Sequence, residues 1–134
     1  FDYIIMSAAV GDYHCQKIAQ EKIKKHEDTL TLQLQKNQDI LLEIGQHKKP
    51  HQIICGFAME TQDLIENAKE KLQKKNCDMI VANHLKTKGA GFQGDTNVVS
   101  ILTSESIHHY DLMSKNDLAF EILNQMKKRE EQKC

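Results

Sequence analysis

The feature that most constrains the fold is a set of three short, almost continuous apolar runs. They read DYIIMSAAV at residues 2–10, HQIICGFA at 51–58 and CDMIVAN at 77–83. Such runs are typical of strands covered on both faces, as in parallel sheets. The first run begins without an initiator Met, so we expect this sequence to be part of a longer polypeptide.

Helical and alternating patterns fill the spaces between the runs. Residues 61–75 predict an amphipathic helix, Asp39 is placed to cap a shorter helix, and residues 115–132 predict a final helix whose charged tail should fray. Strict alternation at residues 30–35 (LTLQLQ) predicts a strand with one solvated face. Residues 97–103 and 108–113 predict a closing antiparallel pair.

This order of elements predicts a single domain over residues 1–134. Strands alternating with helices indicate an α/β, three-layer Rossmann-like fold, with a mostly parallel sheet and a C-terminal antiparallel strand pair. Ligands in such sheets bind beyond the carboxyl ends of the strands. We therefore expect AVGDYH, GFAMET and ANHLKTKGAGF, which follow the three runs, to meet at one edge.

Composition excludes several classes of protein. The 18 basic and 19 acidic residues give a net charge of −1, unlike the basic excess of nucleic-acid or membrane-surface binders. No apolar run has the length of a membrane span. Cys15, Cys55, Cys77 and Cys134 form no CxxC pair, so we expect reduced thiols, a cytoplasmic location and no structural zinc. The scattered histidines predict no metal site.

Glycine motifs for phosphate binding are missing from the sequence. There is no GxGxxG after the first run and no GxxxxGK[ST]. The stretch GAGFQG at residues 89–94 precedes a strand instead of a helix, so it has no helix N-terminus to hold a phosphate. We interpret it as a loop.

Lysines gather in two clusters, which are Lys22, Lys24 and Lys25, and Lys69, Lys71, Lys74 and Lys75. Lys71 and Lys75 share a helix face at spacing i, i+4, where like charges repel. One interpretation is a solvated face, relieved in part by nearby glutamates. The other is a clamp for a phosphate chain. Spacing alone leaves both open.

Six motifs in order resemble a known family. AAVGDYH, KIKK, NQDIL, GFAMET, KLQKKNCDMIVAN and GFQGDTN resemble the phosphopantothenate–cysteine ligase domain of the bacterial bifunctional coenzyme A biosynthesis protein. The resemblance implies a ligase that joins 4′-phosphopantothenate and L-cysteine through an acyl cytidylate. CTP is the co-substrate, Mg²⁺ commonly assists, and CMP and pyrophosphate are released.

The resemblance also implies roles for individual residues. The CTP-binding positions correspond to Asp12, Lys22, Asn37, Gln38, Asp39, Ile40, Phe57, Lys71 and Lys75. The backbone beside Asp12, at Gly11 and Tyr13, would contact the cytosine. Lys71 falls on a lysine important for activity, beside a flexible flap expected at residues 73–79. No protein-bound metal residue is implied.

Two departures from the family pattern concern the nucleotide site. NPDI has become NQDI, so Gln38 replaces a proline and restores a backbone N–H. ADYR has become GDYH, so Gly11 loosens the backbone and His14 replaces a permanent positive charge. We expect a looser turn and weaker or pH-dependent nucleotide binding.

The resemblance covers only the C-terminal part of the ligase domain. The glycine-rich N-terminal half is absent, so this chain alone should hold an incomplete active site. The flavin-dependent decarboxylase that commonly precedes the ligase is absent too, and we expect no flavin here. A homodimer, and fusion to or pairing with such a decarboxylase, are expected by analogy. The alternatives are a non-catalytic nucleotide-binding module of the same fold and a generic Rossmann-like enzyme such as a methyltransferase.

Overall fold

A computed structural model describes residues 1–23, 29–60, 62–84 and 95–133 of the chain. The chain divides into two compact units. One is a layered unit of Phe1–Ser7 and Leu41–Cys134, and the other, Ala8–Ile40, we call the ribbon. Each is described by itself.

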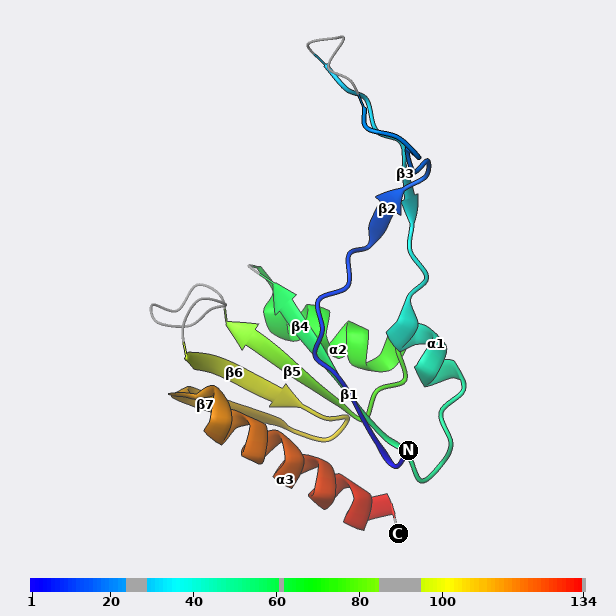
Figure 1. Cartoon of the computed structure of the whole chain (residues 1–134). Coiled ribbons are helices and arrows are strands. Elements are labelled where there is room, and N and C mark those ends of the chain that lie inside the picture. Colours follow the sequence, from blue (N-terminus) through cyan, green and yellow to red (C-terminus); the bar gives the residue numbers. More distant parts are fainter. Residues whose placement is uncertain (24–28, 61, 85–94, 134) are drawn as a thin grey trace. The chain divides into compact units, whose positions relative to one another are not determined.

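The layered unit is built on a five-stranded sheet of order β1-β4-β5-β6-β7 (Figure 1). The strands are β1 (Tyr3–Met6), β4 (Ile53–Glu60), β5 (Met79–His84), β6 (Thr96–Leu102) and β7 (Ile107–Ser114). The first three are parallel, and β6 and β7 are antiparallel to their neighbours. The predicted parallel sheet with a closing antiparallel pair is therefore confirmed.

Helices cover both faces of the sheet (Figure 1). On one face, α1 (Ile40–Gln46) and α2 (Leu64–Lys74) bury a cluster that includes Ile54, Ile80 and Leu102. On the other face, α3 (Lys115–Lys133) buries a second cluster. Successive side chains of each strand enter opposite clusters because a strand alternates its faces. The three-layer prediction is confirmed.

The first apolar run is not covered on both faces, which corrects the sequence-based expectation. The strand β1 pairs with β4 and forms an edge of the described sheet. Ile4 and Met6 pack on the α2 side, whereas Tyr3 and Ile5 stay more than a third exposed on the other face. The reason is that α3 packs mainly on β4, β6 and β7. Its described bond to β1 is from the Tyr3 hydroxyl, which donates to Glu130.

The ribbon contains two short antiparallel strands, β2 (Tyr13–Cys15) and β3 (Leu34–Lys36). The predicted strand at residues 30–35 is wrong in its bounds and its burial. Pairing begins only at Leu34, and Leu30, Leu32 and Leu34 are all exposed. Alternation predicted a half-buried strand, but in the described part of the ribbon these leucines have no element that covers them.

Asp78 is the centre of a buried polar cluster that joins three elements. Its carboxylate accepts from Lys48 Nζ at 3.2 Å, from Lys133 Nζ at 2.7 Å and from the Ile54 backbone N–H at 2.8 Å. Lys133 also donates to the carbonyl of Gln52. The end of α3 is thereby fixed to the sheet. The expectation that its charged tail frays is wrong, since its last lysine has a buried partner.

The buried thiols give a prediction about reactivity. Burial raises the pKa of Cys55 to about 12 and of Cys77 to about 11, so both are neutral thiols at pH 8. In a Cys134→Ser background we expect Cys15 alone to react quickly with a thiol reagent. Cys55 and Cys77 should react only as the protein unfolds in urea. Rapid labelling of two or more thiols in the native state would contradict this.

The same shifts predict a loss of stability at high pH. The pKa of each buried thiol is higher in the folded than in the unfolded state. The stabilisation that comes from keeping these thiols neutral is therefore complete below about pH 9. It disappears as the pH rises toward the folded-state values of about 11 and 12.

Candidate active site

In the ribbon, two of the motifs singled out in the sequence meet at Asn37. Its side-chain N–H donates to the carbonyl of Gly11 at 2.6 Å, and its Oδ1 lies 2.6 Å from His14 Nδ1. Its backbone N–H donates to the carbonyl of Asp12 at 2.8 Å. The GDYH and NQDI segments, far apart in sequence, are thus held together by Asn37, and the side chain of Asp12 stays exposed.

The other ribbon candidates lie outside the two paired strands. Gln38 and Asp39 are exposed and directly precede α1, as expected of the residues that start a helix, and Ile40 is its first residue. Lys22 is exposed. Lys24 and Lys25 lie outside the described residues.

The glycine at position 11, where the family pattern has alanine, is not required by lack of space. A Cβ placed there would approach the Tyr13 carbonyl oxygen at 3.7 Å, an ordinary contact. The alanine of the family pattern would therefore fit. His14 takes the place of an arginine but is already engaged with Asn37, so its ring helps to hold the two motifs together.

In the layered unit, Lys71 and Phe57 are brought together. Lys71 lies on α2 and is half-buried, and its Nζ donates to the Phe57 carbonyl on β4 at 2.5 Å. In the parallel register Met6 faces Gly56, so pairing with β1 ends one residue before Phe57. An ammonium carries three N–H donors. Within the described residues, the other two remain for a further acceptor.

The lysines of α2 and of the residue after it have different surroundings. Lys69 forms an exposed pair with Glu66 at 3.3 Å, and Lys74 is exposed. Lys75 caps the C-terminus of α2, is half-buried, and donates its backbone N–H to the Lys71 carbonyl. The solvated-face interpretation therefore suits Lys69 and Lys74.

The segment expected to be a flap, residues 73–79, is packed into the layered unit. Asn76 adopts a left-handed conformation (φ 51°) and donates to the Gly45 carbonyl. Cys77, Asp78 and Met79 are buried. The structure contradicts the flap interpretation, because this segment carries the buried Asp78 cluster and starts β5.

A cleft of about 420 Å³ opens at the carboxyl edge of the parallel strands. It is lined by Ser7 after β1, Phe57 and Met59 of β4, Asn83 and His84 of β5, Asn97 of β6, and Lys115, Leu118, Ala119 and Ile122 of α3. Residues of GFAMET and ANHLKTKGAGF meet at this edge, as expected of segments that follow the second and third runs. AVGDYH belongs to the ribbon, and its meeting with them stays a prediction. Residues 85–94, with the GAGFQG stretch, lie outside them.

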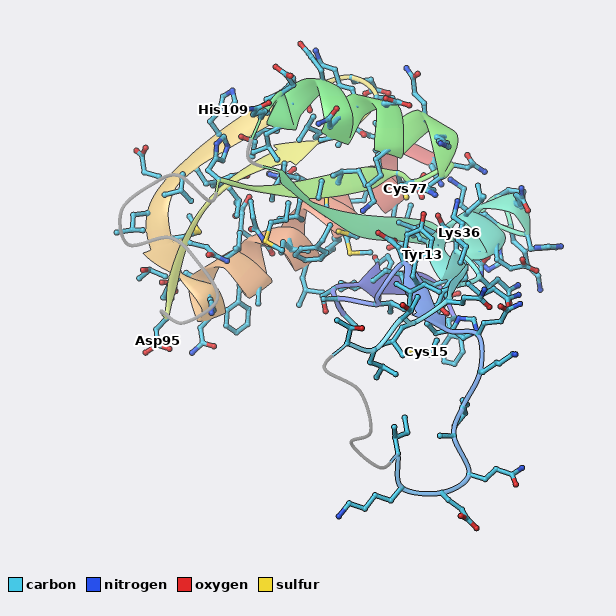
Figure 2. All side chains as sticks on the ribbon, turned by 90° about the horizontal axis from the view of Figure 1, so that it is seen from above. Tyr13, Cys15, Lys36, Cys77, Asp95 and His109 are labelled. Carbon is cyan, nitrogen blue, oxygen red and sulfur yellow. The ribbon has the colours of Figure 1, made fainter. Side chains whose placement is uncertain are left out.

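Beside the cleft, two histidines share one hydroxyl. Ser100 Oγ lies 2.8 Å from His84 Nε2 and 2.7 Å from His109 Nδ1; His109 is labelled in Figure 2. Burial and the neighbouring His109 lower the pKa of His84, so neutral imidazole is favoured. Ser100 is fully buried, so it holds the histidines in place and cannot meet a substrate.

Most of the cleft was not predicted residue by residue. Asn83 and His84 end an apolar run, and polar residues at such ends are a usable signal. Ser7, Asn97 and Lys115 carry no such signal in the sequence. Among the described residues, no group of three His, Cys, Asp or Glu side chains is arranged to hold a metal ion. No helix in the described ranges is long and apolar enough to cross a membrane.

The structure is that of a Rossmann-like α/β domain with a cleft at the carboxyl edge of a mainly parallel sheet. Residues 1–129 match the profile of the DNA/pantothenate metabolism flavoprotein C-terminal domain. The chain belongs to this family.

Individual relatives agree with this assignment. The chain is 46% identical over 127 residues to the coenzyme A biosynthesis bifunctional protein CoaBC of Bacillus subtilis, covering 93% of this chain and 31% of that protein. It is 40% identical to a cysteine/cysteine sulfinic acid decarboxylase from an unknown prokaryote, covering 93% of this chain and 35% of that protein. The chain therefore spans about a third of these curated relatives.

Solved structures share the fold. The crystal structure of the C-terminal domain of a CoaBC protein superposes with a TM-score of 0.75 at 35% identity, covering 98% of this chain and 58% of that one. The DNA/pantothenate metabolism flavoprotein from Streptococcus pneumoniae gives a TM-score of 0.77 at 19% identity, with 96% and 63% covered. At that identity the second likeness concerns the fold alone.

Proposed function

We propose that this chain is the C-terminal part of a ligase that joins 4′-phosphopantothenate and L-cysteine in coenzyme A biosynthesis, with CTP as co-substrate. Family membership and the CoaBC relatives support the biosynthetic role. The observation that carries the nucleotide part is the meeting of the GDYH and NQDI motifs at Asn37. These motifs hold Asp12 and most of the proposed CTP-binding positions.

The proposed reaction proceeds in two steps. The carboxylate of 4′-phosphopantothenate attacks the α-phosphorus of CTP, the α–β bridging P–O bond breaks, and pyrophosphate leaves with the electron pair. The cysteine amine then attacks the acyl carbon of the mixed anhydride. CMP leaves, and the nitrogen loses a proton as the amide forms. Enzymes catalyse such steps mainly by positioning the reactants and by stabilising phosphate charge.

Lys71 is proposed to stabilise that charge. Its bond to the Phe57 carbonyl fixes the position of Nζ, so little side-chain freedom would be lost on binding phosphate. Lys22 and Lys75 are proposed as further phosphate contacts. Mg²⁺ usually binds through substrate phosphates and one or two carboxylates. It would therefore enter with the triphosphate.

A thermal-shift titration of this chain with Mg²⁺ and CTP, ATP, GTP or UTP tests the proposal. A ligand that binds only the folded state raises its apparent stability, so we expect stabilisation that is selective for CTP. The same titration on a chain that includes the upstream glycine-rich half should show a larger shift and amide formation with cysteine. CTP binding without amide formation by the longer chain would favour the non-catalytic module.

Lys71→Gln should weaken CTP binding by about ten- to a hundredfold. A bond to a charged group contributes about 1.5–3 kcal/mol, and glutamine keeps an N–H for the Phe57 carbonyl, so the fold should survive. Lys69→Gln is the matched control, because Lys69 lies on the same helix but pairs with Glu66 at the surface. Titration calorimetry measures both variants. Equal CTP affinities would exclude Lys71 from the phosphate site.

We also propose that the protein is a homodimer that pairs through the ribbon. In the antiparallel register Cys15 faces Leu34 and Tyr13 faces Lys36. Alternate residues of a strand point to the same side, so these four share one face of the ribbon. Tyr13 and Leu34 are 60% and 59% exposed there. An isolated two-stranded ribbon is marginally stable in water, and a second copy would cover this apolar face.

Leu32→Glu should shift the protein from dimer to monomer in sedimentation velocity. A charge on the apolar face would be buried without a partner in the dimer. Gln33→Glu is the control, because it adds the same charge to the alternate face of the same segment. If Leu32→Glu sediments like the parent at every concentration, the ribbon does not form the interface.

The domain boundaries and larger partners are proposals as well. We propose that residues 1–134 are joined in the natural protein to an upstream glycine-rich half. Fusion to, or pairing with, a decarboxylase is supported by the bifunctional and decarboxylase names of the relatives. A cytoplasmic location accords with this metabolic role.

A further inference from the structure

The ribbon has a second face, opposite to the one proposed to meet a partner copy. His14 faces Gln35 in the antiparallel register, and at the next pair the Asn37 backbone N–H donates to the Asp12 carbonyl. Because alternate residues of a strand point to the same side, these four residues share one face, which we call the polar face. Asn37 is half-buried there, and the other three are exposed.

Asn37 fixes which nitrogen of the His14 ring carries a proton. Its side-chain nitrogen donates to the Gly11 carbonyl at 2.6 Å, and a carbonyl can only accept, so the amide has one possible orientation. The side-chain oxygen of Asn37 therefore faces His14 Nδ1, at 2.6 Å. An amide oxygen accepts and never donates, so this bond requires a proton on Nδ1. His14 is thereby held in its Nδ1–H form.

The other ring nitrogen of His14, Nε2, is then an acceptor. A neutral imidazole has one N–H and one nitrogen with a free electron pair. Among the described residues no group is bonded to Nε2, and His14 is exposed. The arginine of the family pattern would carry only donors at this place. The histidine of this chain therefore exchanges a donor for an acceptor whose direction is set by the bond to Asn37.

The charge of the polar face indicates which part of a nucleotide it suits. Asp12 is acidic, and none of the four residues is a lysine or an arginine. A carboxylate repels phosphate, whereas it accepts hydrogen bonds from N–H and O–H groups. Asp12 and His14 Nε2 are therefore two acceptors on one face, and they match a group that carries donors. In CTP the donors are the ribose hydroxyls and the cytosine amine.

We propose that His14 is a specificity-determining residue of the nucleotide site, where its Nε2 accepts a hydrogen bond from a ribose hydroxyl or from the cytosine amine. The ring is fixed by Asn37 before a ligand arrives, so little side-chain freedom is lost on binding. The phosphates would lie off the polar face, away from the Asp12 carboxylate.

This inference rests on the proposed ligase function and adds a contact that the family pattern does not supply. The ribbon already holds Asp12 and most of the proposed CTP-binding positions. His14 would extend that set by one residue, and its contact would concern the uncharged part of the nucleotide.

Titration calorimetry with matched nucleotides tests the proposal on the longer chain that includes the upstream half. The His14→Asn variant carries an amide N–H where Nδ1–H was, so it can keep the bond to Asn37 while it lacks Nε2. We expect it to weaken CTP binding about three- to tenfold, the usual effect of one neutral hydrogen bond. The loss should disappear for the analogue that lacks the donor, which is UTP for the amine and 2′-deoxy-CTP or 3′-deoxy-CTP for a hydroxyl.

A control variant and a second measurement keep the test decisive. His108→Asn, exposed on β7, should bind CTP like the parent. Nitrogen NMR of the histidine rings in the unchanged protein should show the Nδ1–H form of His14, and CTP should shift the Nε2 signal in the direction of an accepted hydrogen bond.

Three results would each overturn the proposal. They are a His14 ring with its proton on Nε2, an Nε2 signal that CTP does not shift, and a His14→Asn variant that binds CTP as tightly as the parent or loses equal affinity for CTP and for every analogue. The ligase function fails separately, if the longer chain forms no amide from the acid, cysteine and CTP.

Discussion

Asp78→Ala is expected to lower the free energy of unfolding by about 3–5 kcal/mol, the usual cost of removing one partner from a buried ion pair. Asp78 is only 6% exposed and accepts from Lys48, Lys133 and the Ile54 backbone. Alanine would leave the ammonium of Lys48, itself 12% exposed, without its carboxylate. The Ile54 N–H would also lose its acceptor.

Urea denaturation followed by circular dichroism measures this effect. Glu66→Ala is the control, since it removes a carboxylate from an exposed pair with Lys69, and such pairs contribute about 0–1 kcal/mol. Asp78→Asn should fall between the two, because its amide oxygen can still accept from Ile54. If Asp78→Ala and Glu66→Ala have equal midpoints, the cluster does not hold α3 and β5 together.

Gly45→Ala should be the second large effect. A Cβ at this position would lie 1.8 Å from the Lys75 carbonyl oxygen and 2.9 Å from its carbonyl carbon. Both are backbone atoms, so the ends of α1 and α2 would have to separate. The Asn76 bond to the Gly45 carbonyl would then be lost. Overpacking costs about 1–3 kcal/mol, which outweighs the helix preference for alanine of about 1 kcal/mol.

Gly11→Ala is the matched control, because the added Cβ meets only an ordinary contact. We expect its melting temperature to stay within a few degrees of the parent, while Gly45→Ala melts well below it. If Lys75 contacts phosphate as proposed, Gly45→Ala should also weaken CTP binding. Equal melting temperatures for the two variants would mean that the helix ends can move apart at little cost.

The elements of the layered unit could be predicted because their patterns are local. The apolar runs of β4 and β5 show in the sequence itself which residues are buried. The helical periodicity of α2 does the same. The pattern could not show that β1 lies at an edge of the described sheet, because the apolar content of a strand does not reveal whether a helix covers it. For the same reason the alternating leucines of the ribbon predicted a half-buried strand, whereas the ribbon leaves them exposed.

For the candidate site, the motifs indicated which residues to consider and at which edge of the sheet to look for a site. The contacts between these residues are known only from the structure. Resemblance singled out Asn37, Phe57 and Lys71 as separate positions. The bonds from Asn37 to Gly11 and from Lys71 to Phe57 join residues 26 and 14 positions apart. These bonds depend on the tertiary fold of the chain, which no local sequence pattern specifies.

The sequence by itself determined the class of fold, the family and the edge at which ligands should bind, because periodicity, apolar content and motif order are properties of neighbouring residues. Only the tertiary structure decided that Asp78 is the centre of a buried ion cluster and that the side-chain oxygen of Asn83 is buried with no donor among the described residues. Charge and amide groups acquire such roles from burial. Burial is set by elements brought together from distant parts of the chain.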